Sequence, residues 1–431
     1  MRHPRRAVLL CLLAALAGAA SAGASGFGLF QHGGRAMGQV GAFTARASEP
    51  SAVTYNPAAI TRLEGTQAQA GLDFNNSDDE YISDAGSFSA NHVIQFPPSL
   101  YATWKQEQGP FALGIGIDSP FYYNLDWRPA LFPGRFLTRR SELRVYEFHP
   151  VAAYDLGEGW SVGGGLRYVL GSLDEEDNVI IPVFLGGGTP PVNVEVERNA
   201  EADVDAFAWD LAVHYTSPVW GWGAVYRSPA ELKGNGEVNY EPRDVPAGIP
   251  GLDAAIRSRI VNGGSRQSFE IPREIRGGVW YAPYPELRIE LDASYQSWSS
   301  LEATDITYDP DVVTGAQSTI RVPRDWEDTL SLRLGLEGDI TDNFLLFGGI
   351  AMEPSPVPGD TLEPGFPRGD ATVYGIGFTY NFPQLSFDVG YSRHEHDDRG
   401  ASGQELLNPN RQSTYTASDT VWGFAVRWRW Q

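Results

Sequence analysis

The sequence contains a single cysteine, Cys11, which lies in an apolar run near the N-terminus. If that run is removed during export, the remaining chain has no thiol for disulfides, thiol catalysis or cysteine-based metal binding. Basic residues are also few: 32 Lys and Arg stand against 54 Asp and Glu, a net charge of −22. Nucleic-acid binding needs clustered Lys and Arg. The composition therefore argues against a nucleic-acid partner.

Long apolar runs are missing as well. After residue 24, no stretch reaches the length of about 18 apolar residues that indicates a membrane-spanning helix. Arg2, Arg5 and Arg6 precede the short apolar run 7–17, and small residues at 20–24 allow cleavage after Ala22 or Ala24. This layout predicts a signal peptide at residues 1–24. The alternative is an N-terminal membrane anchor, which the shortness of the run disfavours.

The clearest pattern in the rest of the chain is an alternation with period two, best seen in Val421–Trp430. One face carries four aromatic residues and a valine, and the other carries Val421, Gly423, Ala425 and two arginines. Such a strand fits between lipid and a polar lumen. The same alternation recurs in 111–118, 207–216, 287–296, 330–337 and 374–381. Charges repeatedly fall on one face, which a dry core does not accept. A soluble β-sandwich with a fully buried aromatic face is the alternative.

The spacing of turns predicts the topology. Six very short connections occur at 107–109, 157–159, 217–218, 284–286, 341–343 and 383–384. Seven long polar stretches separate them, at 76–97, 119–140, 172–203, 230–268, 299–327, 353–370 and 397–413. Short turns alternating with long loops are typical of outer-membrane barrels. We therefore predict an all-β fold, a fourteen-stranded antiparallel transmembrane barrel over residues 65–431.

Residues 25–64 precede the first strand and do not alternate. They are rich in glycine and contain Asn56-Pro57-Ala58, a good helix start because Asn caps and Pro fits the first helical position. We predict that this segment forms a plug, or hatch, inside the lumen. A flexible periplasmic tail is the alternative.

Several stretches, in order along the chain, resemble the family of outer-membrane long-chain fatty acid and aromatic-hydrocarbon transporters (FadL/TodX-like). They are Gly26-Phe27, Gly33-Gly34-Arg35-Ala36, Tyr55-Asn56-Pro57-Ala58, Tyr226-Arg227-Ser228-Pro229, Pro272-Arg273-Glu274-Ile275, Ser297-Trp298, Asp325-Trp326-Glu327-Asp328-Thr329 and Glu353-Pro354-Ser355-Pro356-Val357-Pro358. One departure is the end of the chain, Trp430-Gln431, where the family has a terminal aromatic residue.

The resemblance implies a monomeric, plugged barrel in the outer membrane of a Gram-negative cell, in contact with lipid and lipopolysaccharide. It also implies a route: capture of a hydrophobic solute by outer loops, transfer to a pocket beside the hatch, and release through a lateral opening near a kinked third strand. In this sequence that strand is Phe111–Asp118, and Gly114 and Gly116 would permit the distortion.

Two apolar stretches in the predicted outer loops are candidates for the capture groove. The first is Val179–Leu185, with Ile180, Ile181, Val183, Phe184 and Leu185. Exposed apolar patches commonly mark binding sites, but a strand extension packed on its neighbour is the alternative. The second contains Leu252, Ile256 and Ile260 at helical spacing, which predicts an amphipathic helix that completes the groove or simply caps the barrel mouth.

Candidates for the inner pocket beside the hatch are Phe27, Leu29, Phe30, Asn56 and Pro57. A carboxylate head group would need an inward cation, and Arg144 and Arg167 are candidates, with a structural arginine network as the alternative.

No motif supports catalysis or a cofactor. His394-Glu395-His396 has a metal-like spacing but no fixed third ligand, so we predict no metal site there. The sequence therefore predicts an outer-membrane transporter of hydrophobic molecules and not an enzyme. Long-chain fatty acids are the first candidate solute and aromatic hydrocarbons the second. A general porin or an adhesin are the remaining alternatives.

Overall fold

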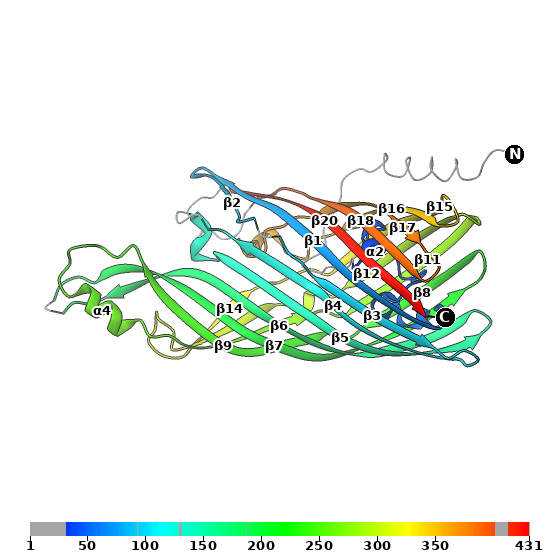
Figure 1. Ribbon diagram of the computed structural model, residues 1–431. Coiled ribbons are helices and arrows are strands. Elements are labelled where there is room, and N and C mark those ends of the chain that lie inside the picture. Colours follow the sequence, from blue (N-terminus) through cyan, green and yellow to red (C-terminus); the bar gives the residue numbers. More distant parts are fainter. Residues whose placement is uncertain (1–31, 93, 129–131, 187, 401–412, 431) are drawn as a thin grey trace.

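The computed structural model describes residues 32–430 except 93, 129–131, 187 and 401–412. Within this part of the chain every strand belongs to one antiparallel sheet. The last strand, β20 (Thr414–Trp430), pairs with the first, β1 (Thr66–Ser83), so the sheet closes into a barrel (Figure 1). The wall has fourteen strands, as the alternation of turns and loops predicted.

Ten wall strands are continuous, and four consist of two segments each. The other continuous strands are β3 (Pro98–Lys105), β4 (Phe111–Asp126), β5 (Arg140–Gly157), β6 (Trp160–Val183), β7 (Val192–Thr216), β16 (Phe344–Glu353), β17 (Ala371–Asn381) and β18 (Leu385–His396). The divided strands are β8 (Trp220–Arg227) with β9 (Ala230–Arg243), β10 (Gly263–Ile271) with β11 (Glu274–Tyr284), β12 (Leu287–Gln296) with β13 (Ala303–Asp309), and β14 (Ser318–Pro323) with β15 (Thr329–Asp339).

Short elements complete the described fold. They are α2 (Gly34–Gly38), α3 (Ala52–Tyr55), α4 (Leu252–Arg259), the 3₁₀ turns η1 (Pro57–Arg62), η2 (Pro133–Phe136), η3 (Trp298–Ser300) and η4 (Gly359–Thr361), and the small strands β2 (Gly86–Ser89) and β19 (Arg399–Gly400). None of these helices is long and apolar enough to span a membrane.

As predicted, apolar side chains of the strands point outward and charged side chains point into the barrel. On β20, Trp422, Phe424 and Val426 are 45%, 42% and 41% exposed and point outward. Charged side chains such as Glu290 and Asp292 on β12 are buried on the inner face. Outward apolar and inward polar residues are the arrangement of a strand between hydrocarbon and a polar lumen.

The six predicted short turns all lie at one end of the barrel, which we call the short-turn end; the opposite end is the long-loop end. The C-terminus also lies at the short-turn end, on the right in Figure 1. Two of the predicted long loops are shorter than expected. β6 continues to Val183 and β7 begins at Val192, so most of 172–203 is strand, and β9, α4 and β10 occupy most of 230–268.

These strands continue beyond the part of the wall with an apolar outer surface because their sequences still alternate apolar and polar residues. Val192, Val194 and Val196 alternate with Asn193 and Glu195, and β7 pairs in this region with both β6 and β9. Residues 179–183 are therefore part of a strand extension and not of an irregular loop, while their role in capturing a solute stays a prediction.

In four wall strands, the alternation shifts by one residue partway along, so that the inward-facing residues change from even-numbered to odd-numbered or the reverse. Even-numbered residues of β4 face inward up to Asp118, and odd-numbered ones do from Phe121, because an irregularity separates the two parts. The same change occurs between β8 and β9, between β11 and β10, and between β14 and β15. Each of these strands therefore has two halves with separate alternation.

Candidate functional site

The N-terminal segment, which we define as residues 32–64, lies against the inner wall of the barrel near the short-turn end (Figure 1). Its α2 packs on β17, β18 and β20, and η1 packs on β5, β6 and β7. The predicted turn start is confirmed: Pro57 is the first residue of η1, and the Asn56 side chain accepts a hydrogen bond from Ala58 N at 3.1 Å.

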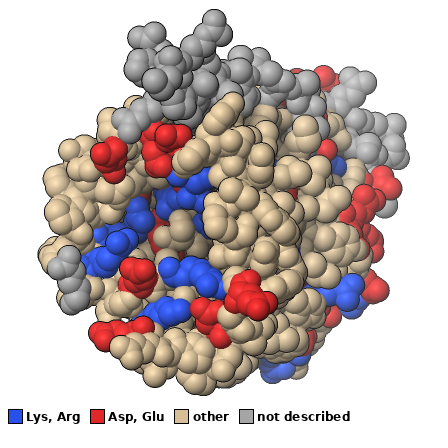
Figure 2. Space-filling model, turned by 90° about the vertical axis from the view of Figure 1, so that its right-hand side faces the viewer, with Lys and Arg blue, Asp and Glu red and all other residues tan. Residues whose placement is uncertain are grey.

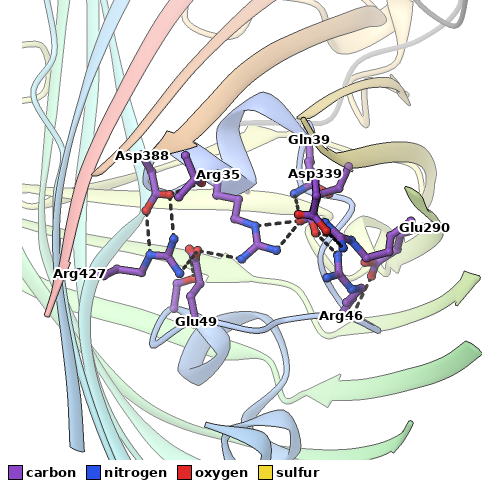
Figure 3. A network of polar contacts seen from close by, with 12 residues as sticks. Arg35, Gln39, Arg46, Glu49, Glu290, Asp339, Asp388 and Arg427 are labelled. Carbon is purple, nitrogen blue, oxygen red and sulfur yellow. Dashed lines mark hydrogen bonds and ion pairs between the residues drawn. The ribbon is translucent and has the colours of Figure 1, made fainter. Parts of the chain in front are cut away.

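One end of this segment is held by Arg35 (Figure 3). Its Nε donates to Glu337 of β15 at 3.0 Å, and its guanidinium lies 3.7 Å from Glu49 of the same segment. Arg427 of β20 links Glu49, at 3.6 Å, to Asp388 of β18, at 2.9 Å. A chain of alternating charges thus connects β15 with β18 and β20 through the N-terminal segment.

The middle of the segment is held through its main chain. Asp292 accepts hydrogen bonds from the N–H groups of Phe43 and Thr44 at 3.0 and 2.8 Å. Glu290, two residues along the same face of β12, accepts from Ala45 N at 2.6 Å and from Arg46 N at 3.2 Å. Four consecutive backbone donors therefore point at two carboxylates of the wall, which satisfies groups that no sheet partner satisfies.

Basic side chains gather on the face seen from the short-turn end (Figure 2). Arg62 of η1 and Lys105 of β3 belong to this end, and both pair with Asp155 of β5, at 3.3 and 3.4 Å. The rim of the barrel thus adds further ion pairs to the attachment of the segment.

Above the N-terminal segment lies a small cavity of about 30 Å³, which we call the inner site. It is lined by His32, Thr54, Tyr55, Pro120, Phe121, Arg167, Arg227, Ile271, Pro272, Glu274, Arg276 and Gln296. Ligand pockets typically measure about 300–1,000 Å³, so a hydrophobic solute enters this site only if side chains move.

The charges of the inner site are paired. Glu147 of β5 accepts from Arg167 Nε at 2.9 Å and from Arg227 Nη2 at 2.5 Å. Glu274 accepts from Arg276 Nη2 at 2.8 Å. Asp210 and Asp118 also act electrostatically on Arg227, so the three arginines of this group already face four carboxylates.

Arg167 and Arg144 differ in position. Arg167 faces inward, is 2% exposed and lines the inner site, as a head-group cation requires. Arg144 was assigned wrongly. It lies on the outer face of β5 and pairs with Glu142, because odd-numbered residues face inward on this strand and Arg144 has the opposite parity.

The irregular part of β4 is tied to the N-terminal segment by Asp118. Its carboxylate accepts from Thr54 Oγ1 at 2.5 Å and from the Tyr101 hydroxyl of β3 at 2.9 Å. The register shift between β4 and β5 begins at this residue and ends at Phe121, which lines the inner site.

Gly114 and Gly116 have another role than the one predicted. Both keep regular pairing with β3 and β5, and the distortion lies beyond them. A Cβ at Gly114 would meet Val53 Cγ2 at 2.7 Å, and one at Gly116 would meet Val53 Cγ1 at 3.0 Å. The glycines therefore make room for the N-terminal segment and do not produce the irregularity.

An apolar cluster covers the inner face on the long-loop side of the inner site; we call it the middle cluster. It includes Phe121 and Ile271, which also line the inner site, and several aromatic residues: Tyr81, Tyr123, Trp127, Phe132, Phe269, Trp298, Trp326, Phe366 and Tyr415. Trp298 and Trp326 pack edge to face with centroids 5.1 Å apart.

A second apolar cluster, the outer cluster, lies at the far long-loop end. Ile181 and Val183 of β6 pack there with Leu252 and Ile256 of α4, while Leu185 and Ile260 lie at its edge. The amphipathic helix predicted from Leu252, Ile256 and Ile260 is confirmed, and so is its contact with the first apolar stretch. Ile180, on the opposite face of the strand, is instead 53% exposed, and Phe184, directly after the end of the strand, is 69% exposed.

Between the apolar belt and the outer cluster, the outer face of β6 is acidic. Burial raises the pKa of Asp174 to about 6 although Arg140 opposes the shift, and Glu201 adds to it. Burial and then the neighbouring Glu197 raise the pKa of Glu176 to about 7. In the described structure, this part of the wall carries acids that gain protons near neutral pH.

Other predicted residues have simpler outcomes. Phe27, Leu29 and Phe30 lie outside the described residues. Asn56 and Pro57 lie in the N-terminal segment beneath the inner site and do not line it. His396 pairs with Asp419 at 2.9 Å, and no group of three or more His, Cys, Asp or Glu in the described chain could hold a metal ion.

The main residues that sequence reasoning missed are the wall residues of the inner site. Arg227, Pro272, Glu274 and Gln296 come from the ends of strand segments next to the interruptions in the wall. Three of them belong to the stretches that resemble the transporter family, and Gln296 directly precedes one of these stretches. The signal was therefore present, as short polar motifs that break otherwise regular alternation.

Comparison with known proteins agrees with this architecture. A family model described as "Outer membrane protein transport protein (OMPP1/FadL/TodX)" matches residues 13–431. Among curated proteins, the long-chain fatty acid transport protein of Escherichia coli O6:H1 (strain CFT073) is 24% identical over 385 residues, 83% of each chain. Its counterpart in Salmonella typhi is 23% identical over 381 residues, 83% of this chain and 84% of the relative.

Solved structures show the same fold. A Pseudomonas aeruginosa FadL homologue superposes with a TM-score of 0.81 at 18% identity, covering 94% of this chain and 99% of that one. The Pseudomonas putida toluene transporter TodX gives a TM-score of 0.72 at 13% identity and covers 94% and 100%.

Proposed function

Because this chain belongs to the OMPP1/FadL/TodX family of outer-membrane transport proteins, whose members carry hydrophobic molecules, we propose that it takes up long-chain fatty acids through three successive sites. The solute binds first at the outer cluster, then at the inner site, and leaves through the wall at the irregular part of β4. The N-terminal segment acts as the plug that keeps the lumen closed to other solutes.

The observation that carries this proposal is the pair of apolar clusters on the inner face of the barrel. Elsewhere the inner wall is polar or is covered by the N-terminal segment, and a hydrophobic solute would not remain there. Each methylene that moves from water into an apolar cluster contributes about 0.8 kcal/mol, so a long acyl tail gains substantial affinity at either cluster. The middle cluster shares Phe121 and Ile271 with the inner site, which supports a direct transfer between them.

The presence of cations in the inner site supports a solute with a carboxylate head group. Arg167 lines the site together with Arg227 and Arg276. We assign Arg167 to the head group and leave Arg144, which faces outward, without a role in binding.

The exit is placed at Asp118–Phe121 and not at the glycines. Pro120 and Phe121 line the inner site, and they belong to the stretch where β4 loses regular pairing with β5. A solute held there is separated from the surrounding lipid by the least regular part of the β4–β5 pairing.

The test uses two neighbouring residues with opposite orientations. Ile181→Asn places an amide in the outer cluster, whereas Ile180→Asn changes an exposed residue of the same strand. We expect Ile181→Asn to weaken saturable binding of a fluorescent long-chain fatty acid and to slow its uptake, and Ile180→Asn to leave both near the unmodified level. Equal behaviour of the two variants would refute the capture role of the outer cluster.

An aromatic hydrocarbon is the second candidate solute. The aromatic side chains of the middle cluster, with Trp298 and Trp326 edge to face, favour it because aromatic rings pack well on one another. Uptake of toluene and of oleate by the same cells separates the two candidates. Arg167→Gln should reduce oleate uptake only, since toluene has no charge.

A further inference from the structure

The outer surface of the wall carries an apolar groove that none of the sites above includes. It measures about 390 Å³ and is lined by Ala68, Gln69, Ala70, Leu100, Tyr101, Ala102, Ile115, Gly116, Ile117, Val426 and Trp428. These residues come from four neighbouring strands, β20, β1, β3 and β4, on the front of the barrel in Figure 1. We infer that this groove binds one acyl chain of a phospholipid from the periplasmic leaflet of the outer membrane.

The pairing register explains why a groove exists here. One lateral row reads Trp428, Ala68, Ala102, Ile115 across the four strands, and the next reads Val426, Ala70, Leu100, Ile117. Large side chains stand at both sides, and three alanines form a low floor between them. The large residues are exposed by 38–52%, so they project into the surroundings as walls.

Both ends of the groove are bounded. On the short-turn side, Thr66 pairs with both Trp430 and Trp104, so a tryptophan stands on either side of it. On the other side, Leu72 pairs with Phe424 and Pro98. Aromatic residues of this kind commonly mark the membrane–water interface. The tryptophan pair therefore places that end of the groove at the periplasmic interface.

The length of the groove matches one leaflet. Thr66 and Leu72 are six residues apart, which is about 20 Å along a strand at a rise of about 3.4 Å per residue. With a strand tilt of about 45°, this corresponds to about 14 Å of membrane depth, close to half of the apolar band of about 25 Å. A chain in the groove thus belongs to the periplasmic leaflet, which consists of phospholipid.

The occupant follows from the surroundings. Walls and floor face the hydrocarbon phase, where transfer from water contributes nothing and packing alone decides binding. An unfilled groove would forfeit dispersion contacts along its sides. A single acyl chain is narrow and flexible enough to fill a trough one strand pair wide.

The position of the groove gives its occupant a structural effect. Tyr101 and Gly116 form part of the floor, and directly behind them lies Val53 of the N-terminal segment, 3.0 Å from where a Cβ on Gly116 would stand. The same Tyr101 donates to Asp118. A bound chain therefore packs against a stretch of wall that directly contacts the N-terminal segment on its inner side.

The experiment uses phosphatidylethanolamine with a photoreactive diazirine in one acyl chain, incorporated into vesicles with the complete protein. After illumination, cross-linked peptides are mapped by mass spectrometry. We expect several-fold more cross-links per outward residue at 68–70, 100–102 and 115–117 than at outward residues of β12 and β15 on the far wall. Equal labelling of both walls would mean that only ordinary boundary lipid is present and would overturn the inference.

Filling the groove provides the matched comparison. Ala68→Leu with Ala102→Leu should abolish the excess labelling, whereas Ala293→Leu, an outward alanine of β12, should leave it unchanged. Heat-modifiable gel mobility verifies that all variants are folded barrels. If free oleate displaces the photoreactive lipid, the groove is a solute site and the assignment to phospholipid is wrong. This outcome is independent of the Ile181 test, because the inference requires only that the outer wall faces lipid.

Discussion

The N-terminal segment near the short-turn end and the outer cluster near the long-loop end are held together by different forces. Near the short-turn end, the N-terminal segment is attached by ion pairs and by backbone hydrogen bonds to Glu290, Asp292 and Glu337. In the outer cluster, Ile181, Leu252 and their neighbours pack mainly through apolar contacts. Directional bonds fix one partner in one place, whereas apolar surface accepts solutes of many shapes. The comparison suggests that retention and capture are separated along the barrel axis.

The largest effect is expected from removing Glu337, which attaches the N-terminal segment to the wall. Its carboxylate receives Arg35, Arg46 and Arg288, and Glu337→Ala leaves three buried or half-buried guanidinium groups without it. Loss of one partner from a buried ion pair costs about 3–5 kcal/mol. We expect the variant to show raised ionic conductance in planar bilayers, because the N-terminal segment is loosened.

Glu237→Ala, at an exposed position on β9, is the control and should conduct like the unmodified protein. Unchanged conductance of Glu337→Ala would show that its ion pairs do not hold the segment.

A somewhat smaller effect is expected in the outer cluster. Leu252→Ala removes a side chain that is 1% exposed, which costs about 2–5 kcal/mol in a well-packed cluster. Because α4 lies far from the N-terminal segment, fatty acid binding should weaken while bilayer conductance stays low. Val261→Ala, at a residue that is 54% exposed, provides the control. A rise in conductance of Leu252→Ala would contradict the independence of the two regions.

Asp118 tests the boundary between the two regions. Asp118→Ala removes the acceptor of the Thr54 and Tyr101 hydroxyls, and each buried group left unsatisfied costs about 1–3 kcal/mol. We expect faster hydrogen exchange in 111–126 and in the N-terminal segment together. Ser119→Ala, whose hydroxyl has no hydrogen-bond partner among the described residues, should change neither. Faster exchange in only one of the two segments would show that Asp118 does not couple them.

The smallest effect concerns pH. The folded-state pKa values of Asp174 and Glu176 are raised to about 6 and about 7, so the folded extension binds protons that the unfolded chain releases near its ordinary pKa of about 4. The stabilisation is therefore complete at low pH and decreases as the pH rises through these values. Hydrogen exchange of 172–183, corrected for intrinsic rates, should be slower at about pH 5 than at about pH 8.

In the double variant Asp174→Asn with Glu176→Gln, the corrected exchange rates of 172–183 at about pH 5 and about pH 8 should be much closer to each other. An unchanged difference between the two rates would show that other groups cause the pH dependence.

Much of the barrel could be predicted from the sequence because lipid and water impose a strict alternation. The six short turns and the fourteen strands follow from it, as does α4 from the spacing of Leu252 and Ile256. The extensions of β6 and β7 could have been recognised from the alternation in 192–197, but their polar residues favoured a loop.

The inner site could not be assembled from the sequence. Arg227, Glu274 and Gln296 lie far apart along the chain and meet only because the strands break at their ends. Arg144 was misassigned because its parity is visible only once the register of β5 is known.

The phase changes in the wall have a consequence for how such barrels diversify. Each of the four affected strands is two separately phased pieces, joined at 119–120, 228–229, 272–273 and 324–328. At these joints, one residue can be gained or lost without turning either piece of the strand over. In a continuous strand, the same change would move every following side chain to the other face of the wall. These four strands therefore tolerate changes in length that the ten others do not.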